Sequence, residues 1–403
     1  MTHAIKKVIE ACEKDPACSQ NYPDLENRFL EVLDSLNKEP IKIEGFSNEP
    51  IMVDAQVFVL AIFAMIYTKD GMEVLPMLVE MTEQGNDWIF RPLAQSLLTW
   101  PIENDMLKII SMNDRATFAE PTGSHSYEDP FFQAVYQYCY NDFDHKIERI
   151  YSEILELTPH PYDTTTTVYQ TPVLLFDGFY DPVTPPIFTD QVAGYFPNHI
   201  SFTVADRGHD ASGGFEQIIP AYISNPGVKP DLAELQGSPN FEFAHDIILN
   251  SGISSLAMKI ATGNYLTTAI ILGIVLLLLV IGFLYFPIRF IVKKVGKKPV
   301  ALPITITLST WLIAFFSIVF LGVLALAVSD TLSSNMYLLA FGLPGQWWIL
   351  FIFPWLVLIA LLVSLYFYQK YRPIGSGNKI FWSLSWFGGL GFLLFFWVSG
   401  VIF

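Results

Sequence analysis

The feature that most constrains this sequence is the apolar composition of residues 260–403. Four uncharged runs make up most of this half of the chain: residues 260–288, 299–329, 331–369 and 380–403. Each run supplies the about 20 residues that a helix needs to cross ~30 Å of hydrocarbon. A buried helix of a soluble protein rarely extends this far without a polar face. The sequence therefore predicts four transmembrane helices, near residues 266–288, 301–327, 347–368 and 380–402.

The positive charges of this half indicate how the helices cross the membrane. All eight lie in "PIRFIVKKVGKKP", between the first two spans, and "QKYRPIGSGNK", between the last two. The loop near residues 328–346 holds only Asp330. Loops rich in Lys and Arg remain in the cytoplasm. We therefore expect a multi-pass protein of the cell membrane, with residues 1–258 and the C-terminus outside the cytoplasm.

The acidic half ahead of the first span must be exported if this orientation holds. Residues 260–403 carry a net charge of +7, which leaves −23 for residues 1–259 because the whole chain carries −16. The first residues, "MTHAIKKVIEACEKDPAC", contain no apolar core and cannot be a signal peptide. Either the orientation is wrong or the export signal lies in a segment ahead of these residues, and we expect the second.

The cysteine spacing agrees with export. Cys12 and Cys18 form a C-x5-C pair in a polar segment. In an exported domain such a pair predicts a local disulfide, and the alternative is two buried free thiols. A metal site is not expected, because no nearby His or Cys completes a set of ligands. Cys139 is left over, either as a free thiol or with a partner that these residues lack.

The hydrophobic pattern changes from helical spacing to strands near residue 168. "VYQTPVLLFDG" is a continuous apolar run, typical of a parallel strand buried on both faces. A helix is predicted over "TPPIFTDQVAGYF", with Thr184 as N-cap and Pro185 in its first turn. "HISFTVAD" predicts a second strand, and "GFEQIIPAYISN" a closing helix. Two parallel strands cannot bury both faces of a sheet, so the α/β fold is expected to be incomplete.

The ends of these two strands carry the candidate catalytic residues. Asp181 follows the first strand and His209 follows the second, directly after the permissive Gly208. A carboxylate in this place can fix the tautomer of a histidine that accepts a hydroxyl proton. In α/β-hydrolases the nucleophile precedes the acid and the histidine. No G-x-S-x-G sequence occurs, and the partial matches "GFSNE" (Ser47) and "GISSL" (Ser254) follow no apolar strand.

These residues carry a resemblance to a known family. "TPVLLFDGFYDPVTPP" and "HISFTVADRGHD" resemble the C-terminal part of the tripeptidyl-aminopeptidase-like α/β-hydrolases, which are relatives of proline iminopeptidase. "ACEKDPACSQNYPDL" resembles the C-x5-C-x3-Y-P segment that opens the helical cap of that family, and "YCYND" (138–142) its C-x-D segment. The resemblance extends over about residues 8–245.

The resemblance implies a role for each matched residue. Asp181 would be the acid and His209 the base of a catalytic triad, and residues 1 to about 160 would form the cap. In this family the nucleophile and the oxyanion loop precede the C-x5-C segment, so they would lie before Met1. The signal peptide, most of the sheet and a partner for Cys139 would lie there too. Family members often carry cysteines after the G-H pair, whereas this chain has none after Cys139, and its four-span domain is outside the usual pattern.

Three acidic residues of the cap segment leave two interpretations open. Glu73, Glu80 and Glu83 could hold the α-amino group of a substrate, as acidic cap residues do in related aminopeptidases. On a half with a net charge of −23, a solvated acidic face is the simpler expectation.

The combined prediction has three parts. We expect a mostly helical cap in residues 1–165, the C-terminal part of an α/β-hydrolase with Asp181 and His209 in residues 166–258, and an all-α four-span domain in residues 259–403. The parent protein would be an exported, membrane-anchored serine hydrolase of the aminopeptidase type that acts on peptides or on small esters and amides. This chain alone would be inactive, because it lacks the nucleophile.

Other functions make different demands. The alternative to an enzyme is a non-catalytic membrane protein whose hydrolase-like domain only binds. A transporter is disfavoured because the predicted spans contain no ionisable residue. We expect no cofactor, no metal and no nucleic acid; the bilayer is the expected partner, and the oligomeric state is left open.

Overall fold

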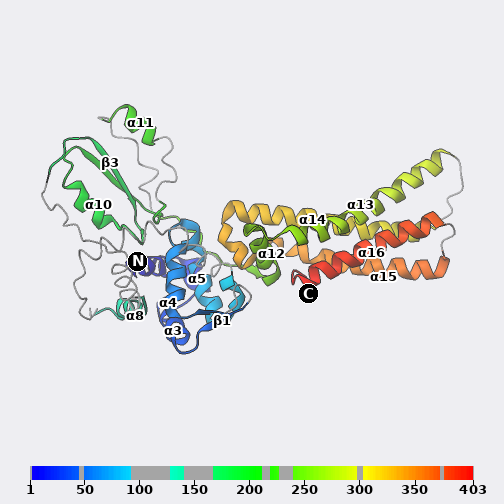
Figure 1. The fold of residues 1–403 in the computed structure, drawn as a ribbon, viewed down its shortest axis with the longest axis horizontal. Coiled ribbons are helices and arrows are strands. Elements are labelled where there is room, and N and C mark those ends of the chain that lie inside the picture. The colour runs from blue at the N-terminus through cyan, green and yellow to red at the C-terminus, as the bar shows by residue number, and fades with distance from the viewer. Residues whose placement is uncertain are drawn as a thin grey trace, which may run out of the picture. The chain divides into compact units, whose positions relative to one another are not determined.

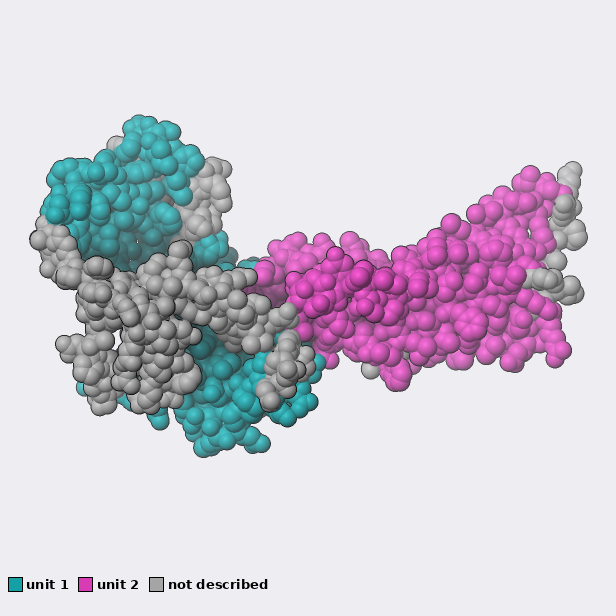
Figure 2. Space-filling model, in the orientation of Figure 1, with its two compact units in different colours: residues 1–245 teal, residues 246–403 magenta. Residues whose placement is uncertain are grey.

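A computed structural model describes residues 2–44, 50–91, 128–139, 167–210, 218–226, 239–296, 303–372 and 376–402. The chain divides into two compact units (Figure 2): unit 1 is Met1–His245 and unit 2 is Asp246–Phe403. Unit 1 contains a helical part and an α/β part, and unit 2 contains the long apolar helices.

The helical part of unit 1 is built from short amphipathic helices (Figure 1). These are α1 (Thr2–Lys14), α2 (Pro16–Asn21), α3 (Leu25–Lys38), α4 (Ala55–Met65), α5 (Lys69–Glu83) and α8 (Pro130–Cys139), with the 3-10 helix η1 (Asp87–Ile89). Asp54 and Thr68 cap α4 and α5 by accepting backbone N–H groups of the first turn. Three aromatic rings form the centre of the core: Phe29 packs against Phe58 and Phe131.

Two features of this part were not expected from the sequence. The strands β1 (Ile41–Ile43) and β2 (Ile51–Val53) pair antiparallel, although the residues of β2 were included in a helical pattern. Cys12 in α1 and Cys18 in α2 have their sulfur atoms at bonding distance, 2.00 Å, which agrees with the predicted disulfide. The segment "YCYND" lies largely outside the described residues, and so does the side chain of Cys139.

The α/β part of unit 1 consists of β3 (Val173–Gly178), α10 (Pro186–Ala193), β4 (His199–Val204) and α11 (Ile218–Ser224). The two strands are parallel and in register from Val173 opposite His199 to Gly178 opposite Val204. Phe202 and Val204 are buried on the sheet. Within the described residues this sheet has two strands, so the complete α/β fold is not seen.

The start of α10 differs from the prediction. The helix begins at Pro186 with Pro185 as its N-cap residue, one position later than expected. Thr184 does not cap the helix because its hydroxyl group donates to Asp181 Oδ2 at 2.9 Å. The threonine therefore belongs to the loop of the candidate acid.

Unit 2 contains the four predicted spans. The helices long and apolar enough to cross a membrane are Leu266–Val295, Ile304–Ser334, Gly345–Tyr371 and Gly377–Val398. In the labels of Figure 1 they comprise α13 (Leu266–Val295), α14 (Ile304–Ser334), η3 (Gly345–Ile352) with α15 (Phe353–Tyr371), and α16 (Ser376–Val398). The prediction of a multi-pass membrane domain is confirmed at this level.

Small and hydroxyl-bearing residues bring the spans together, as is common when helices pack in lipid. A methyl group on Gly389 would lie 2.3 Å from the side chain of Ile313, so only glycine fits between α14 and α16. Thr310 and Ser364 join α14 to α15 through a hydrogen bond of 2.9 Å. These contacts support a bundle with a fixed internal packing.

The boundary between the units falls earlier than the domain limit drawn from the sequence. β5 (Ile247–Leu249) pairs antiparallel with β6 (Gly342–Pro344), which follows the 3-10 helix η2 (Met336–Ala340). Asn250 caps α12 (Ser251–Ala261) and donates to the carbonyl oxygen of Val401 at 3.0 Å. Residues 246–258 therefore pack with the spans, and the expected all-α domain includes a small sheet.

Candidate functional site

The candidate acid lies in a tight turn at the carboxyl end of β3. The N–H group of Asp181 donates to the carbonyl oxygen of Gly178 at 3.1 Å, which starts the turn. Its Oδ1 atom accepts from the N–H groups of Val183 at 2.7 Å and Thr184 at 2.8 Å. The carboxyl group is 95% buried by residue exposure of 5%, so its orientation is fixed by these contacts.

The candidate base meets this carboxyl group directly. His209 Nδ1 lies 2.9 Å from Asp181 Oδ2 and 3.1 Å from Oδ1. An ionised carboxylate only accepts hydrogen bonds, so Nδ1 carries the proton and Nε2 carries the lone pair. The histidine side chain is 39% exposed, and Nε2 has no hydrogen-bond partner among the described residues. This nitrogen is therefore available to accept a proton from an added group.

The surroundings keep Asp181 ionised. Burial acts to raise the pKa of Asp181, but the hydrogen bonds from the Thr184 backbone, from His209 and from the Val183 backbone outweigh it and lower that pKa. Asp177, four residues earlier on β3, shows the opposite shift. Burial raises the pKa of Asp177, against the hydrogen bonds from Thr203 and Thr189 that lower it. The two carboxyl groups are thus set apart, and Asp181 is the one suited to hold an imidazolium.

The loop that carries His209 is packed against the turn between α4 and α5. A methyl group on Gly208 would lie 2.2 Å from the carbonyl oxygen of Ile66 and 2.6 Å from that of Tyr67. Asp210 N–H donates to the same Tyr67 carbonyl oxygen at 2.9 Å. Glycine is therefore required here by close backbone approach rather than by permissive dihedral angles, which was the reason inferred from the sequence.

Tyr67 also contacts the histidine ring itself. The two rings meet edge to face, with centroids 5.0 Å apart. Two residues further on, Lys69 forms an ion pair of 2.9 Å with Asp206 at the start of the histidine loop. The sequence gave no local signal for Tyr67, because its role depends on packing between segments that are far apart in the chain.

The acid turn has a second support from α1. Lys7 Nζ donates to the carbonyl oxygen of Phe179 at 2.9 Å and lies 3.9 Å from the centroid of the Phe179 ring. Gly178 packs against the histidine loop, because a methyl group there would lie 2.1 Å from the carbonyl oxygen of Gly208. Both candidate residues are therefore positioned by the helical part of unit 1 as well as by the strands.

The acidic cap residues do not converge on this pair. Glu73 is buried and accepts the N–H group of Glu242 at 3.0 Å. Glu83 is held by Arg28, with Oε2 at 3.0 Å from Nε. Glu80 accepts from the amide group of Gln84 at 3.3 Å. In the described part of the chain these carboxylates have structural partners or face solvent.

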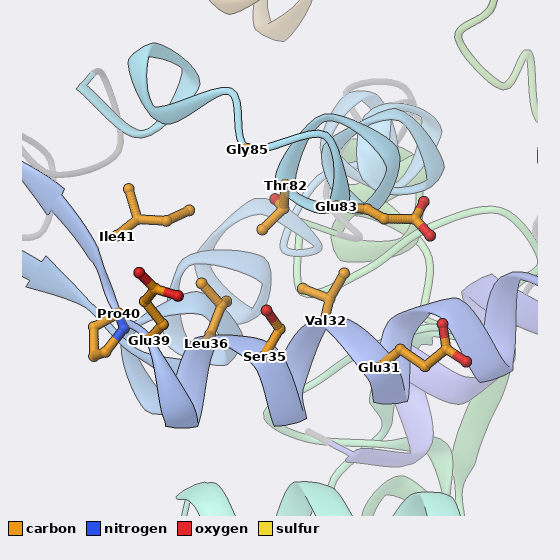
Figure 3. A pocket seen from close by; sticks show the side chains of 10 residues that line it. All are labelled: Glu31, Val32, Ser35, Leu36, Glu39, Pro40, Ile41, Thr82, Glu83 and Gly85. Atoms are coloured by element: carbon orange, nitrogen blue, oxygen red, sulfur yellow. The ribbon is translucent and has the colours of Figure 1, made fainter.

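A pocket of about 480 Å³ lies at the far end of α5 (Figure 3). Side chains of α3 face those of the end of α5 across it, and Glu31, Glu39 and Glu83 line its rim. α5 has 15 residues, so this end is ~20 Å from the end that meets His209. The pocket is therefore separate from the Asp181–His209 pair.

The remaining sequence candidates add no catalytic group to the pair. Ser254 is buried in α12 of unit 2, and Ser47 lies outside the described residues. No group of three or more His, Cys, Asp or Glu residues in the described ranges could hold a metal ion.

The comparison with protein families agrees with this geometry. Residues 156–232 match the family model described as TAP-like protein, an α/β-hydrolase family. The matched segment contains β3, β4, Asp181 and His209, so this part of the chain is a relative of α/β-hydrolases. No curated protein and no solved structure matches the chain. Together with the four spans, the match defines a membrane-anchored, hydrolase-like protein.

Proposed function

We propose that this protein is part of an exported serine hydrolase in which Asp181 orients His209 and His209 acts as general base. The observation that carries the proposal is the contact of 2.9 Å between His209 Nδ1 and the buried Asp181 carboxylate, in an imidazole whose Nε2 side is accessible. A surface histidine without a function needs no buried acid with five hydrogen bonds behind it.

The chemistry follows from the tautomer. Nε2 removes the proton from a serine hydroxyl group as its oxygen attacks the substrate carbonyl carbon. The proton then passes from Nε2 to the leaving amine or alcohol, and the acyl-enzyme forms. Water enters, gives a proton to Nε2 and attacks the acyl carbon, so that the acid product leaves and the serine regains its proton. Asp181 stays ionised throughout and stabilises the imidazolium.

The nucleophile is proposed to come from a segment outside these 403 residues. No G-x-S-x-G sequence occurs in them. The α/β part also exposes apolar surface that a longer sheet would bury: Ile187 is 60% exposed and Phe188 48%. Exposed apolar patches of this kind mark contact surfaces. A segment that adds strands here would complete the sheet and bring a serine to Nε2.

The substrate class and location rest on the family likeness and on the sequence. TAP-like relatives suggest an aminopeptidase of the proline iminopeptidase type, acting on short peptides or on small esters and amides. The basic loops between the spans and the Cys12–Cys18 disulfide favour an extracytoplasmic unit 1.

The test is hydrolysis of aryl esters and peptide anilides by membranes from cells that make the protein in its natural form. His209→Ala should lower turnover by about 10⁶-fold, and Asp181→Asn by about 10⁴-fold because it leaves the wrong tautomer. His199→Ala is the matched control, since its ring is on β4 and bonds only the carbonyl oxygen of Phe196 among the contacts described. Equal activity in all three variants would favour a non-catalytic binding domain.

A further inference from the structure

An apolar pocket of about 240 Å³ lies between α13 and α14 in the membrane unit. Seven residues line it: Phe286, Pro287, Phe290, Ile304, Thr307, Leu308 and Trp311. These are the C-terminal part of α13 and the N-terminal part of α14, so the pocket lies at the end of the spans that carries the basic loops. Because both helices are spans, the solvent at its walls is lipid.

Trp311 gives the pocket an unused polar group. Its ring stacks between Phe283, at a centroid distance of 5.2 Å, and Phe315, at 5.0 Å. Its Nε1 atom is buried and has no acceptor among the described residues. A buried N–H group without an acceptor is unfavourable, and lipid chains offer none. The pocket therefore suits a ligand that brings an oxygen atom with its apolar part.

The charge beside the pocket is positive. Lys293 and Lys294 follow Phe290 by three and four positions, so they continue the same face of α13 one turn toward the membrane surface. Residues 260–329 contain no Asp or Glu that could offset this charge within the two helices. An anionic group is therefore favoured at this end of the pocket.

We propose that this pocket binds one anionic phospholipid. An acyl chain occupies the groove between Phe286, Phe290 and Leu308, an ester oxygen accepts the Trp311 N–H group, and the phosphate lies against Lys293 and Lys294. A phospholipid is the occupant that combines these three chemistries within a bilayer. The site is independent of the hydrolase chemistry proposed for unit 1.

Native mass spectrometry of the full chain in detergent tests the proposal, with phosphatidylglycerol and phosphatidylcholine of identical acyl chains as probes. The unchanged chain should retain one phosphatidylglycerol in preference to phosphatidylcholine. Lys293→Gln with Lys294→Gln should weaken phosphatidylglycerol binding by about 30-fold and leave phosphatidylcholine unchanged. Lys370→Gln with Lys379→Gln is the matched control, because it removes two charges from α15 and α16.

Two further variants test the pocket itself. Leu308→Trp fills it and should lower the affinity for both lipids. Trp311→Phe keeps the stacked ring and removes the N–H group, so it should weaken both lipids equally, by about 5-fold. This milder variant decides the matter if Leu308→Trp fails to fold. Equal affinity of the unchanged chain for the two lipids, or an equal loss in the control pair, would overturn the proposal.

Discussion

Substituting Gly208 tests whether the candidate base is held by close backbone packing. In Gly208→Ala the new methyl group would meet the carbonyl oxygens of Ile66 and Tyr67 at 2.2 and 2.6 Å. Both obstructing atoms are backbone, so the histidine loop must move away from the turn between α4 and α5. Overpacking of this kind costs about 1–3 kcal/mol, and two backbone obstacles favour the upper end, ~3 kcal/mol.

The assay is hydrogen exchange of the full chain in detergent, followed in peptides that cover residues 199–210. A loss of ~3 kcal/mol in the free energy of local opening should accelerate exchange there by about 150-fold. Gly194→Ala is the matched control, because its methyl group would meet only a helix carbonyl at 3.4 Å. It should leave exchange unchanged or slow it slightly. Similar exchange in both variants would refute the packing argument.

Three further predictions concern unit 1 and the membrane topology. Replacing both Cys12 and Cys18 by Ala should destabilise the helical part by about 2 kcal/mol, since the bridge closes a short loop; mass spectrometry should find the bridge in untreated protein, and free thiols there would count against export. Cysteines introduced at positions 294 and 207 should react with impermeant reagents from opposite sides of the membrane, and labelling from one side would reject the proposed orientation. Because the pKa of Asp181 is lowered in the folded protein, its stabilising contribution should be complete above pH ~4 and disappear as pH falls through that lowered pKa; exchange of residues 173–210, corrected for intrinsic rates, should show this loss, and Asp181→Asn should not.

The parts that the sequence predicted are those with a local signal. Long uncharged runs are a property of single residues in sequence, so the four spans were found with nearly correct limits. Asp181 and His209 were found because parallel strands bring their carboxyl ends to one edge of a sheet. The strands β5 and β6 have three residues each, too few for any periodic pattern, so they were missed.

The parts that the sequence did not predict depend on contacts between distant segments. Nothing near Tyr67 indicates that its ring meets His209, because that contact exists only after the cap helices pack on the strands. Thr184 had the local features of an N-cap, but its hydroxyl group is used by Asp181 instead. Glu73 was a candidate ligand for an amine, yet it is engaged by the backbone of Glu242. In each case tertiary packing decided between two local possibilities.

The central claim is that His209 activates a hydroxyl group held beside its Nε2 atom. The most direct measurement is labelling with a fluorophosphonate probe in membranes from cells that make the protein naturally, followed by identification of the modified serine. The account predicts a labelled serine in a G-x-S-x-G sequence outside these 403 residues, on a segment that co-purifies with unit 1. His209→Ala should abolish this labelling and His199→Ala should not. Labelling at one of the chain's own serines, or labelling that persists in His209→Ala, would contradict the account.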